Sequence, residues 1–191
     1  MTFSPELFAT TAVRGGLVPD PATGAVLTPI YQSTTYHQEA VGVHKGFTYS
    51  RAANPTVSAL ETALGALEDT PPAVCFATGM AAISTLFLAV LKSGDHVVVS
   101  DVVYGGTVRL FQQVLANFGV EASFVDTSDP VAVAKAIQPN TKLVFIETPA
   151  NPTLKLTDIA AIAKVAHAAG IKLAVDKIGR ASCRERVLFA V

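Results

Sequence analysis

The stretch KLVFIETPANPTLKLTDIAAIAKVAHAAGIKLAVD, residues 142–176, decides the fold class. It opens with a nearly continuous apolar run at 142–147 and closes with another at 171–176. Between them, residues 158–169 carry a helical pattern that Gly170 ends. Strands without polar alternation are typical of a sheet that is covered on both faces. The stretch therefore predicts a strand, a helix and a second strand of one buried sheet.

The same alternation of strands and helices extends back to about residue 74. The other strand candidates are 73–77, 96–100 and 121–126, and the other helix candidates are 80–91, 107–118 and 130–137. Alternating elements of this kind favour an α/β domain with a mostly parallel sheet and flanking helices.

The first third of the chain has a different pattern. Glycines and prolines between residues 15 and 29 interrupt any regular element, which predicts a loosely packed, extended arm preceded by one short helix. A helix then begins at Asn54-Pro55-Thr56, because asparagine is a good N-cap and proline suits the first turn. We therefore expect an N-terminal arm at 1–55 and a partial α/β domain at 56–176.

Composition excludes several classes of protein. Of 191 residues, 50% are hydrophobic and 15% charged, with a mean hydropathy of +0.44, which excludes intrinsic disorder. A net charge of −1 gives no electrostatic footprint for nucleic acid or an anionic membrane. The N-terminus does not resemble a secretory signal, and the longest nearly apolar run, 80–91, is too short to cross a bilayer. We expect a soluble, cytoplasmic protein.

Cysteine and histidine add two further exclusions. The two cysteines, Cys75 and Cys183, cannot support a disulfide-rich scaffold. None of the four histidines has a ligand-like partner at helical spacing, so no metal site is expected.

The pattern changes abruptly after Asp176. Residues 177–191 read KIGRASCRERVLFAV, with charges crowded into a stretch without clear periodicity. The codons ATC GGA AGA GCG TCG TGT AGG GAA AGA GTG, a sequencing-adapter string, encode residues 178–187 in this order. We therefore expect 177–191 to be a non-native tail and leave it out of the reasoning on the fold. The alternative is an ordinary basic, solvated tail.

Four positions at expected strand ends have side chains or backbone suited to a ligand. Thr78-Gly79-Met80 lies where a strand gives way to a helix, and a helix N-terminus suits a phosphate. Tyr104, beside two glycines, can stack on a flat ligand. Asp176 ends a strand where ligands of open α/β sheets bind, and it can pair with a cationic ring nitrogen. Asn151 precedes a proline. For each, a plain turn, cap or packing role stays open.

Five motifs together carry a family resemblance. They are YSRAANPT at 49–56, TGM at 78–80, YGGTVRLF at 104–111, ETPANP at 147–152 and a strand ending VD at 175–176. In this order and spacing the chain resembles, over roughly residues 8–176, the Cys/Met-metabolism enzymes that use pyridoxal phosphate (PLP). The group includes cystathionine γ-synthase, cystathionine lyases, methionine γ-lyase and O-acetylhomoserine sulfhydrylase. The resemblance implies a truncated aspartate-aminotransferase-like fold.

The resemblance also implies a role for each motif residue. Thr78, Gly79 and Met80 would bind the PLP phosphate, and Tyr104 would stack on the ring as a catalytic residue. Asn151 would lie by the ring hydroxyl, and Asp176 would keep the ring nitrogen protonated. Tyr49 and Arg51 would reach the phosphate of a neighbouring subunit's cofactor. Arg109 would contact the substrate carboxylate.

The implied activity belongs to trans-sulfuration and methionine biosynthesis. It is γ-replacement or γ-elimination on homoserine esters or cystathionine, in a homotetramer whose subunits share active sites. YGGTVRLF favours a cystathionine γ-synthase or cystathionine lyase over methionine γ-lyase or O-acetylhomoserine sulfhydrylase. One departure is serious: nothing after Asp176 matches the segment whose lysine forms a Schiff base with PLP. We therefore expect this chain to be an inactive fragment.

Two alternatives belong to other functional classes. A nucleotide-binding oxidoreductase is disfavoured, because the chain has no G-x-G-x-x-G fingerprint. A truncated, non-catalytic module would retain the fold without the chemistry.

Overall fold

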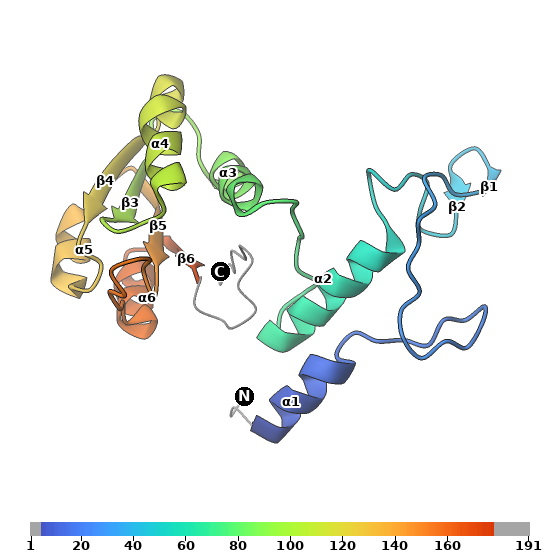
Figure 1. The fold of residues 1–191 in the computed structure, drawn as a ribbon. Coiled ribbons are helices and arrows are strands. Elements are labelled where there is room, and N and C mark those ends of the chain that lie inside the picture. Colours follow the sequence, from blue (N-terminus) through green and yellow to red (C-terminus); the bar gives the residue numbers. More distant parts are fainter. Residues whose placement is uncertain (1–4, 178–191) are drawn as a thin grey trace. The chain divides into compact units, whose positions relative to one another are not determined.

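The computed structural model describes residues 5–177, and these residues fall into two compact units (Figure 1). Among the described residues, one unit comprises 5–75 and the other 76–177. Each unit is described by itself below.

A four-stranded parallel sheet forms the centre of the second unit. Its strands are β3 (His96–Ser100), β4 (Glu121–Val125), β5 (Thr141–Glu147) and β6 (Lys172–Asp176), in the order β4-β3-β5-β6. All three neighbouring pairs are parallel, so the carboxyl ends of the four strands meet at one edge of the sheet. The last register pair at that edge joins Glu147 of β5 to Asp176 of β6.

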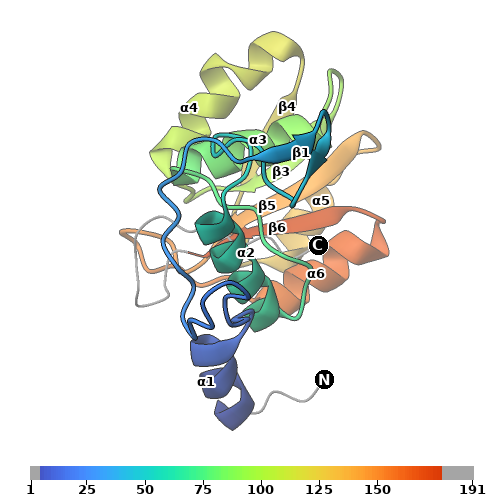
Figure 2. The same cartoon turned by 90° about the vertical axis from the view of Figure 1, so that its right-hand side faces the viewer.

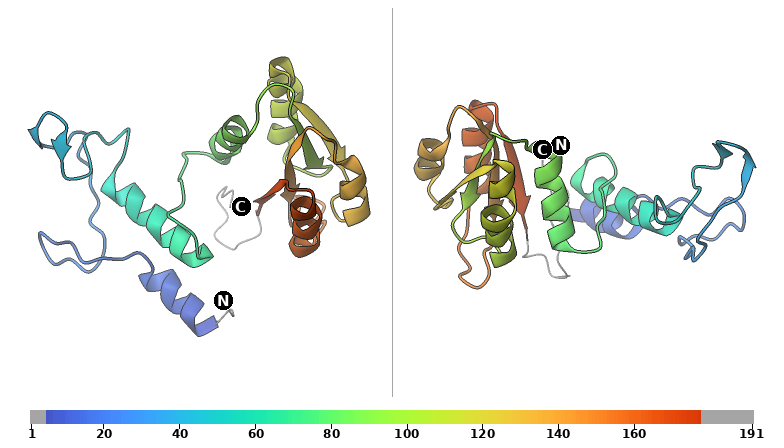
Figure 3. Two further views of the ribbon diagram at one scale, coloured as in Figure 1. Left: turned by 180° about the vertical axis from the view of Figure 1, so that it is seen from behind. Right: turned by 90° about the horizontal axis from the view of Figure 1, so that it is seen from above.

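Helices cover both faces of this sheet (Figures 2 and 3). Helices α3 (Gly79–Val90) and α4 (Gly105–Gln113), with the 3-10 turn η1 (Leu115–Phe118), cover one face, and α5 (Pro130–Ala136) and α6 (Ile159–Ala168) cover the other. Alternate residues of each strand supply the two cores. Val97, Val99 and Phe145 point to the first face, and Val98, Val144 and Ile146 to the second. Burial on both faces explains the unbroken apolar runs.

These elements confirm the predicted alternation, with bounds shifted by one or two residues at most ends. Two details differ. The helix expected over 107–118 begins at Gly105 and divides into α4 and η1 near Val114. The prediction of a strand at 73–77 is wrong. Ala73 N–H donates to Glu61 O (2.9 Å), and Cys75 N–H donates to Glu61 Oε1 (2.9 Å). These donors are therefore bonded to a helical residue, whereas the donors of a strand would be bonded to a neighbouring strand.

The first unit contains α1 (Pro5–Arg14), the short strands β1 (Gln38–Ala40) and β2 (Val43–His44), and α2 (Pro55–Glu68). Helix α2 begins as predicted: Asn54 Oδ1 accepts from Thr56 N–H (2.8 Å), and Pro55 occupies the first turn. The hairpin of β1 and β2 was not predicted. Its turn uses Gly42 at φ 77°, a conformation that favours glycine.

Helix α2 packs against α1, and the boundary between the two units falls after Cys75. The division of the chain at residue 55 into a loosely packed arm and a partial domain stays a prediction. Within residues 5–177 no helix is long and apolar enough to span a membrane. Of the proposed non-native tail, residues 178–191 lie outside the described part of the chain.

Buried His96, at the amino end of β3, gives the sheet a pH dependence. Its Nδ1 lies 2.8 Å from Thr141 Oγ1 and its Nε2 lies 2.9 Å from Ser123 Oγ, so the ring links β3 to both neighbouring strands. Burial lowers the pKa of His96 below 6.5, although Glu121 opposes the shift. The unfolded chain therefore binds this proton more readily, so the contribution of His96 to the free energy of unfolding should fall as the pH falls below 6.5, opposite in sign to the contribution of Asp176 in this range.

Urea unfolding of the chain between pH 5 and 8 checks this expectation. Below pH 6.5 the free energy of unfolding of His96→Gln should fall less, or rise more, with decreasing pH than that of the wild-type chain, whereas the control His167→Gln, on the exposed surface of α6, should follow the wild-type chain. Equal slopes in the wild-type chain and the His96 variant would contradict a lowered pKa of His96 in the folded chain.

Candidate active site at the carboxyl edge of the sheet

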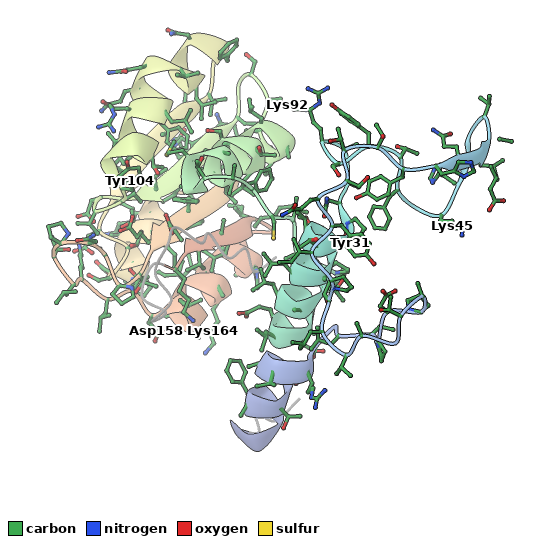
Figure 4. The ribbon with its side chains drawn as sticks, turned by 45° about the vertical axis from the view of Figure 1, so that its right-hand side comes forward. Tyr31, Lys45, Lys92, Tyr104, Asp158 and Lys164 are labelled. Carbon is green, nitrogen blue, oxygen red and sulfur yellow. The ribbon has the colours of Figure 1, made fainter. Side chains whose placement is uncertain are left out.

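The loops after β3 and β5 bring two of the predicted residues to the carboxyl edge of the sheet. Tyr104 precedes α4 (Figure 4), and its side chain is 49% exposed. Asn151 follows β5 in an exposed loop. Asp176 ends β6 at the same edge and is only 5% exposed. The sheet thus places Tyr104, Asn151 and Asp176 at one end, as predicted from the strand ends.

One buried carboxylate, Glu147, connects these positions. Its Oε2 accepts a hydrogen bond from Tyr104 N–H (2.6 Å), and its Oε1 accepts one from Asn151 N–H (3.2 Å). Glu147 is also the register partner of Asp176 on the neighbouring strand. Paired residues of parallel strands project to the same face, so the two carboxyl groups lie on the same side of the sheet.

The two carboxyl groups differ in how they are stabilised. Burial raises the pKa of Asp176 to about 7, and the neighbouring Glu147 adds to the shift. Burial also raises the pKa of Glu147, but the hydrogen bonds from Asn151 and Tyr104 oppose that shift. No hydrogen bond contributes to the pKa of Asp176, in contrast to that of Glu147. A positively charged group of a ligand would therefore stabilise the ionised form of Asp176.

The N-terminus of α3 presents free backbone donors. Thr78 caps the helix: its Oγ1 accepts from Ala81 N–H (3.1 Å), and its carbonyl oxygen accepts from Ala82 N–H (3.1 Å). Within residues 5–177 the N–H groups of Gly79 and Met80 have no hydrogen-bond partner. Free N–H groups at the positive end of a helix suit an anion.

Helix α3 meets the Tyr104 loop through Gly106. A Cβ atom at Gly106 would lie 2.4 Å from Tyr104 Cε1 and 2.9 Å from Met80 Sδ, closer than real Cβ contacts. Glycine is therefore required for the ring of Tyr104 and the side chain of Met80 to approach the start of α4. This contact places the N-terminus of α3 beside the Tyr104 loop.

Arg109 lies on α4, exposed, with Nη1 near the first turn of its own helix. A Cβ at Gly105 would lie 3.4 Å from that atom. Its contact with a substrate carboxylate stays a prediction.

A second polar group ties the loops of the same edge together. Lys155 Nζ lies 3.1 Å from Asp101 Oδ1, after β3, and 2.7 Å from Asp126 Oδ1, after β4. The hydrogen bond from Lys155 contributes most to lowering the pKa of Asp126 to about 2. Lys155, in the loop after β5, thereby links three strand ends.

Tyr49 and Arg51 belong to the first unit, so their position relative to this edge stays a prediction. The Arg51 guanidinium lies 4.9 Å from the centroid of the Tyr49 ring. Asn54 holds the preceding segment, because its Nδ2 donates to Tyr31 O (3.0 Å) and to Ser50 Oγ (3.0 Å). The backbone N–H of Tyr31, which is labelled in Figure 4, donates to Thr56 Oγ1 at the start of α2 (2.9 Å).

Sequence reasoning missed Glu147 and Lys155. Glu147 carries a recognisable signal, since it is the one charged residue at the end of the apolar run LVFIE. Lys155 carries none, because its partners Asp101 and Asp126 are distant in sequence and meet it only through the sheet. Among the described residues no cluster of side chains could hold a metal ion.

Comparison with known proteins gives a consistent result. The probable cystathionine γ-synthase of Herpetosiphon aurantiacus is 53% identical over 169 residues, covering 88% of this chain and 53% of that protein. The cystathionine γ-lyase of Bacillus subtilis is 50% identical over 167 residues, covering 87% of this chain and 44% of that protein. The chain thus spans about half the length of the curated relatives it matches.

The fold agrees with a solved structure. The crystal structure of metB from Corynebacterium glutamicum matches with a TM-score of 0.84 at 45% sequence identity, covering 91% of this chain and 46% of that one. The predicted α/β fold class is confirmed. The alternative of a nucleotide-binding oxidoreductase is not supported by these matches. Residues 9–185 match the family described as Cys/Met metabolism PLP-dependent enzyme, and the chain belongs to that family.

Proposed function

We propose that this chain forms the cofactor-binding part of a PLP-dependent enzyme of trans-sulfuration. The observation that carries the proposal is the grouping of Tyr104, Asn151 and Asp176 around buried Glu147 at the carboxyl edge of the sheet. Ligands of open α/β sheets bind at this edge. The family uses PLP, which supports the assignment of the ligand.

The residues at this edge fit PLP. The N–H groups of Gly79 and Met80 suit its phosphate, and buried Asp176 suits its ring nitrogen, because a protonated nitrogen stabilises the ionised carboxylate. The exposed ring of Tyr104 is available to stack on a flat ring. Asn151, carried by the loop that Glu147 fixes, is proposed to lie beside the ring hydroxyl.

PLP supplies an electron-withdrawing ring that accepts the electrons of a broken bond at the substrate's α-carbon. The proposed task of this chain's residues is to bind and orient that ring. Asp176 keeps a proton on the ring nitrogen, and Tyr104 holds the ring plane as a catalytic residue. Arg109 would contact the substrate carboxylate, and Tyr49 and Arg51 would bind the phosphate of a neighbouring subunit's cofactor.

For the whole protein we propose γ-replacement or γ-elimination on homoserine esters or cystathionine, in a cytoplasmic homo-oligomer. The relatives named cystathionine γ-synthase and cystathionine γ-lyase support this class. Methionine γ-lyase and O-acetylhomoserine sulfhydrylase activities are the alternatives.

The test begins with the source DNA beyond the codon for Asp176. If that reading frame encodes an asparagine and then a serine–x–threonine–lysine segment, the whole protein should be expressed and assayed. Cystathionine formed from a homoserine ester and cysteine would support γ-replacement, and cleavage of cystathionine would support γ-elimination. If the PLP-loaded protein shows neither activity, the proposal is refuted.

We also propose that the 191-residue chain alone has no turnover. Among the described lysines, Lys155 lies in a loop at the carboxyl edge, but Asp101 and Asp126 hold its ammonium and raise its pKa. Lys177 adjoins Asp176 directly. The purified chain should be mixed with PLP, reduced with borohydride and digested to map labelled lysines. Scattered substoichiometric labels and no product are expected, whereas a stoichiometric label on one lysine with activity would contradict this.

A further inference from the structure

We propose that Glu147 is a positioning residue of the cofactor site: it holds the Tyr104 and Asn151 loops in register with each other and places a second carboxylate beside Asp176. The inference rests on the proposed function for its ligand, but its geometric part concerns the chain alone. The three supporting observations are the two hydrogen bonds, the burial of the side chain and the register with Asp176.

Both oxygens of Glu147 are used, and each one by a different loop. Oε2 accepts from Tyr104 N–H, at the start of α4, and Oε1 accepts from Asn151 N–H, in the loop after β5. An ionised carboxylate accepts hydrogen bonds at both oxygens, whereas a carboxamide accepts at one and donates at the other. Only the charged carboxylate matches two N–H donors, so the chemistry of the position selects Glu over Gln.

The location of Glu147 explains why a charge is retained in so apolar a place. It is 1% exposed and follows Leu143–Ile146, all of them buried core residues. Burying a carboxylate is unfavourable unless hydrogen bonds compensate for the lost water. The two N–H groups provide that compensation, and they belong to the two loops whose side chains the proposed function uses. Because both loops are hydrogen-bonded to one carboxylate at the end of β5, the spacing between Tyr104 and Asn151 is fixed.

Glu147 also affects the charge balance at Asp176. Thr148 N–H donates to Asp176 O (3.0 Å), so the end of β5 is bonded directly to the end of β6. Among the described residues Glu147 is the charged group that raises the pKa of Asp176. Two neighbouring carboxylates favour a ligand that brings a positive charge, which a protonated ring nitrogen does. Glu147 therefore contributes to ligand selection without touching the ligand.

The test uses Glu147→Gln in the 191-residue chain, with Glu121→Gln as the matched control. Glu121 is exposed at the amino end of β4, the opposite edge of the sheet. In Glu147→Gln the new carboxamide should keep its oxygen on Tyr104 N–H, whose bond is the shorter, and turn its NH₂ group toward Asn151 N–H. Amide hydrogen exchange at Asn151 should then accelerate about tenfold, with Tyr104 little changed.

Two further measurements separate positioning from general damage. The carboxyl ¹³C titration of Asp176 should show its pKa falling below about 7 in Glu147→Gln but not in Glu121→Gln. Affinity for pyridoxamine 5′-phosphate, which has the ring and phosphate of PLP but no aldehyde, should fall about tenfold in Glu147→Gln alone. If that variant fails to fold, Glu147→Asp retains the charge but shortens the reach, and accelerated exchange at Asn151 is again expected.

The possible outcomes distinguish this inference from the proposed function. Unchanged exchange at Asn151 in a folded Glu147 variant, or equal effects in the Glu121 control, would overturn the positioning role. If exchange accelerates as expected but the wild-type chain binds no pyridoxamine 5′-phosphate, the geometric part stands and the proposed function fails.

Discussion

Replacing Asp176 with Asn should change ligand-free stability and ligand affinity in opposite directions. Asparagine cannot ionise, so the variant avoids burying a carboxylate whose pKa is raised to about 7 from its ordinary value of 3.8. The contribution of Asp176 to the stability of the wild-type chain is lost as the pH rises from 3.8 through about 7, because the unfolded chain releases this proton first. At pH 8 the variant should therefore be more stable by roughly 2–4 kcal/mol.

The same substitution should weaken pyridoxamine 5′-phosphate binding by roughly 10- to 100-fold, because a hydrogen bond between charged groups is lost. Urea unfolding at pH 5 and 8 and a binding titration at pH 8 measure the two effects. Asp158→Asn is a suitable control, since Asp158 caps α6, where a neutral asparagine also caps well. An Asp176 variant that is destabilised at pH 8, or that binds as tightly as wild type, would contradict the assignment.

Phe145→Ala should lower the free energy of unfolding of the sheet unit more than a substitution on its surface. Phe145 is fully buried in β5, and its ring centroid lies 5.1 Å from that of Phe87 in an edge-on arrangement. Truncation leaves a cavity between α3 and the sheet that neighbouring side chains fill only in part. A loss of about 3–5 kcal/mol in the free energy of unfolding is expected.

The control for this cavity is Phe118→Ala, because Phe118 lies in η1 and is 67% exposed. Its loss should change stability by less than about 1 kcal/mol. Urea unfolding followed by circular dichroism measures both. Similar losses in the two variants would contradict the placement of Phe145 at the centre of the core.

The parallel sheet was predictable because its strands are buried on both faces. Runs such as HVVVS and LVFIE have no polar alternation, and this pattern is typical of strands that helices cover on both sides. The N-cap residue Asn54 marked a helix start for an equally local reason, since it accepts a hydrogen bond from the first turn. Local chemistry determined these elements, and the sequence displayed it.

The false strand at 73–77 shows where local chemistry was insufficient. A strand needs a neighbouring strand to bond its donors and acceptors, and Ala73 and Cys75 bond to Glu61 instead. β-propensity reports how a side chain fits a sheet, and it does not report whether a neighbouring strand is present. The short hairpin strands near Gly42 were missed because elements of two or three residues carry no periodicity.

The position of the candidate residues at strand ends was predictable, but the connections between them were not. Tyr104 and Asp176 follow apolar runs, so a position at the strand ends could be expected from the pattern alone. The hydrogen bonds from Tyr104 and Asn151 to Glu147 involve backbone N–H groups, which a sequence motif does not display. The pairing of Glu147 with Asp176 depends on the register between β5 and β6, which a motif does not display either. The Lys155 contacts with Asp101 and Asp126 likewise arise only once the sheet order is set.

We propose that the carboxyl edge of this sheet binds the phosphate and ring of PLP. The most direct measurement is amide shift mapping by NMR, with pyridoxamine 5′-phosphate titrated into the ¹⁵N-labelled 191-residue chain. The largest shifts should fall on the amides of Gly79, Met80, Tyr104, Asn151 and Asp176, with saturation at a single affinity. A folded spectrum in which these amides stay unshifted, or in which the shifts fall at the opposite edge around His96 and Glu121, would contradict it.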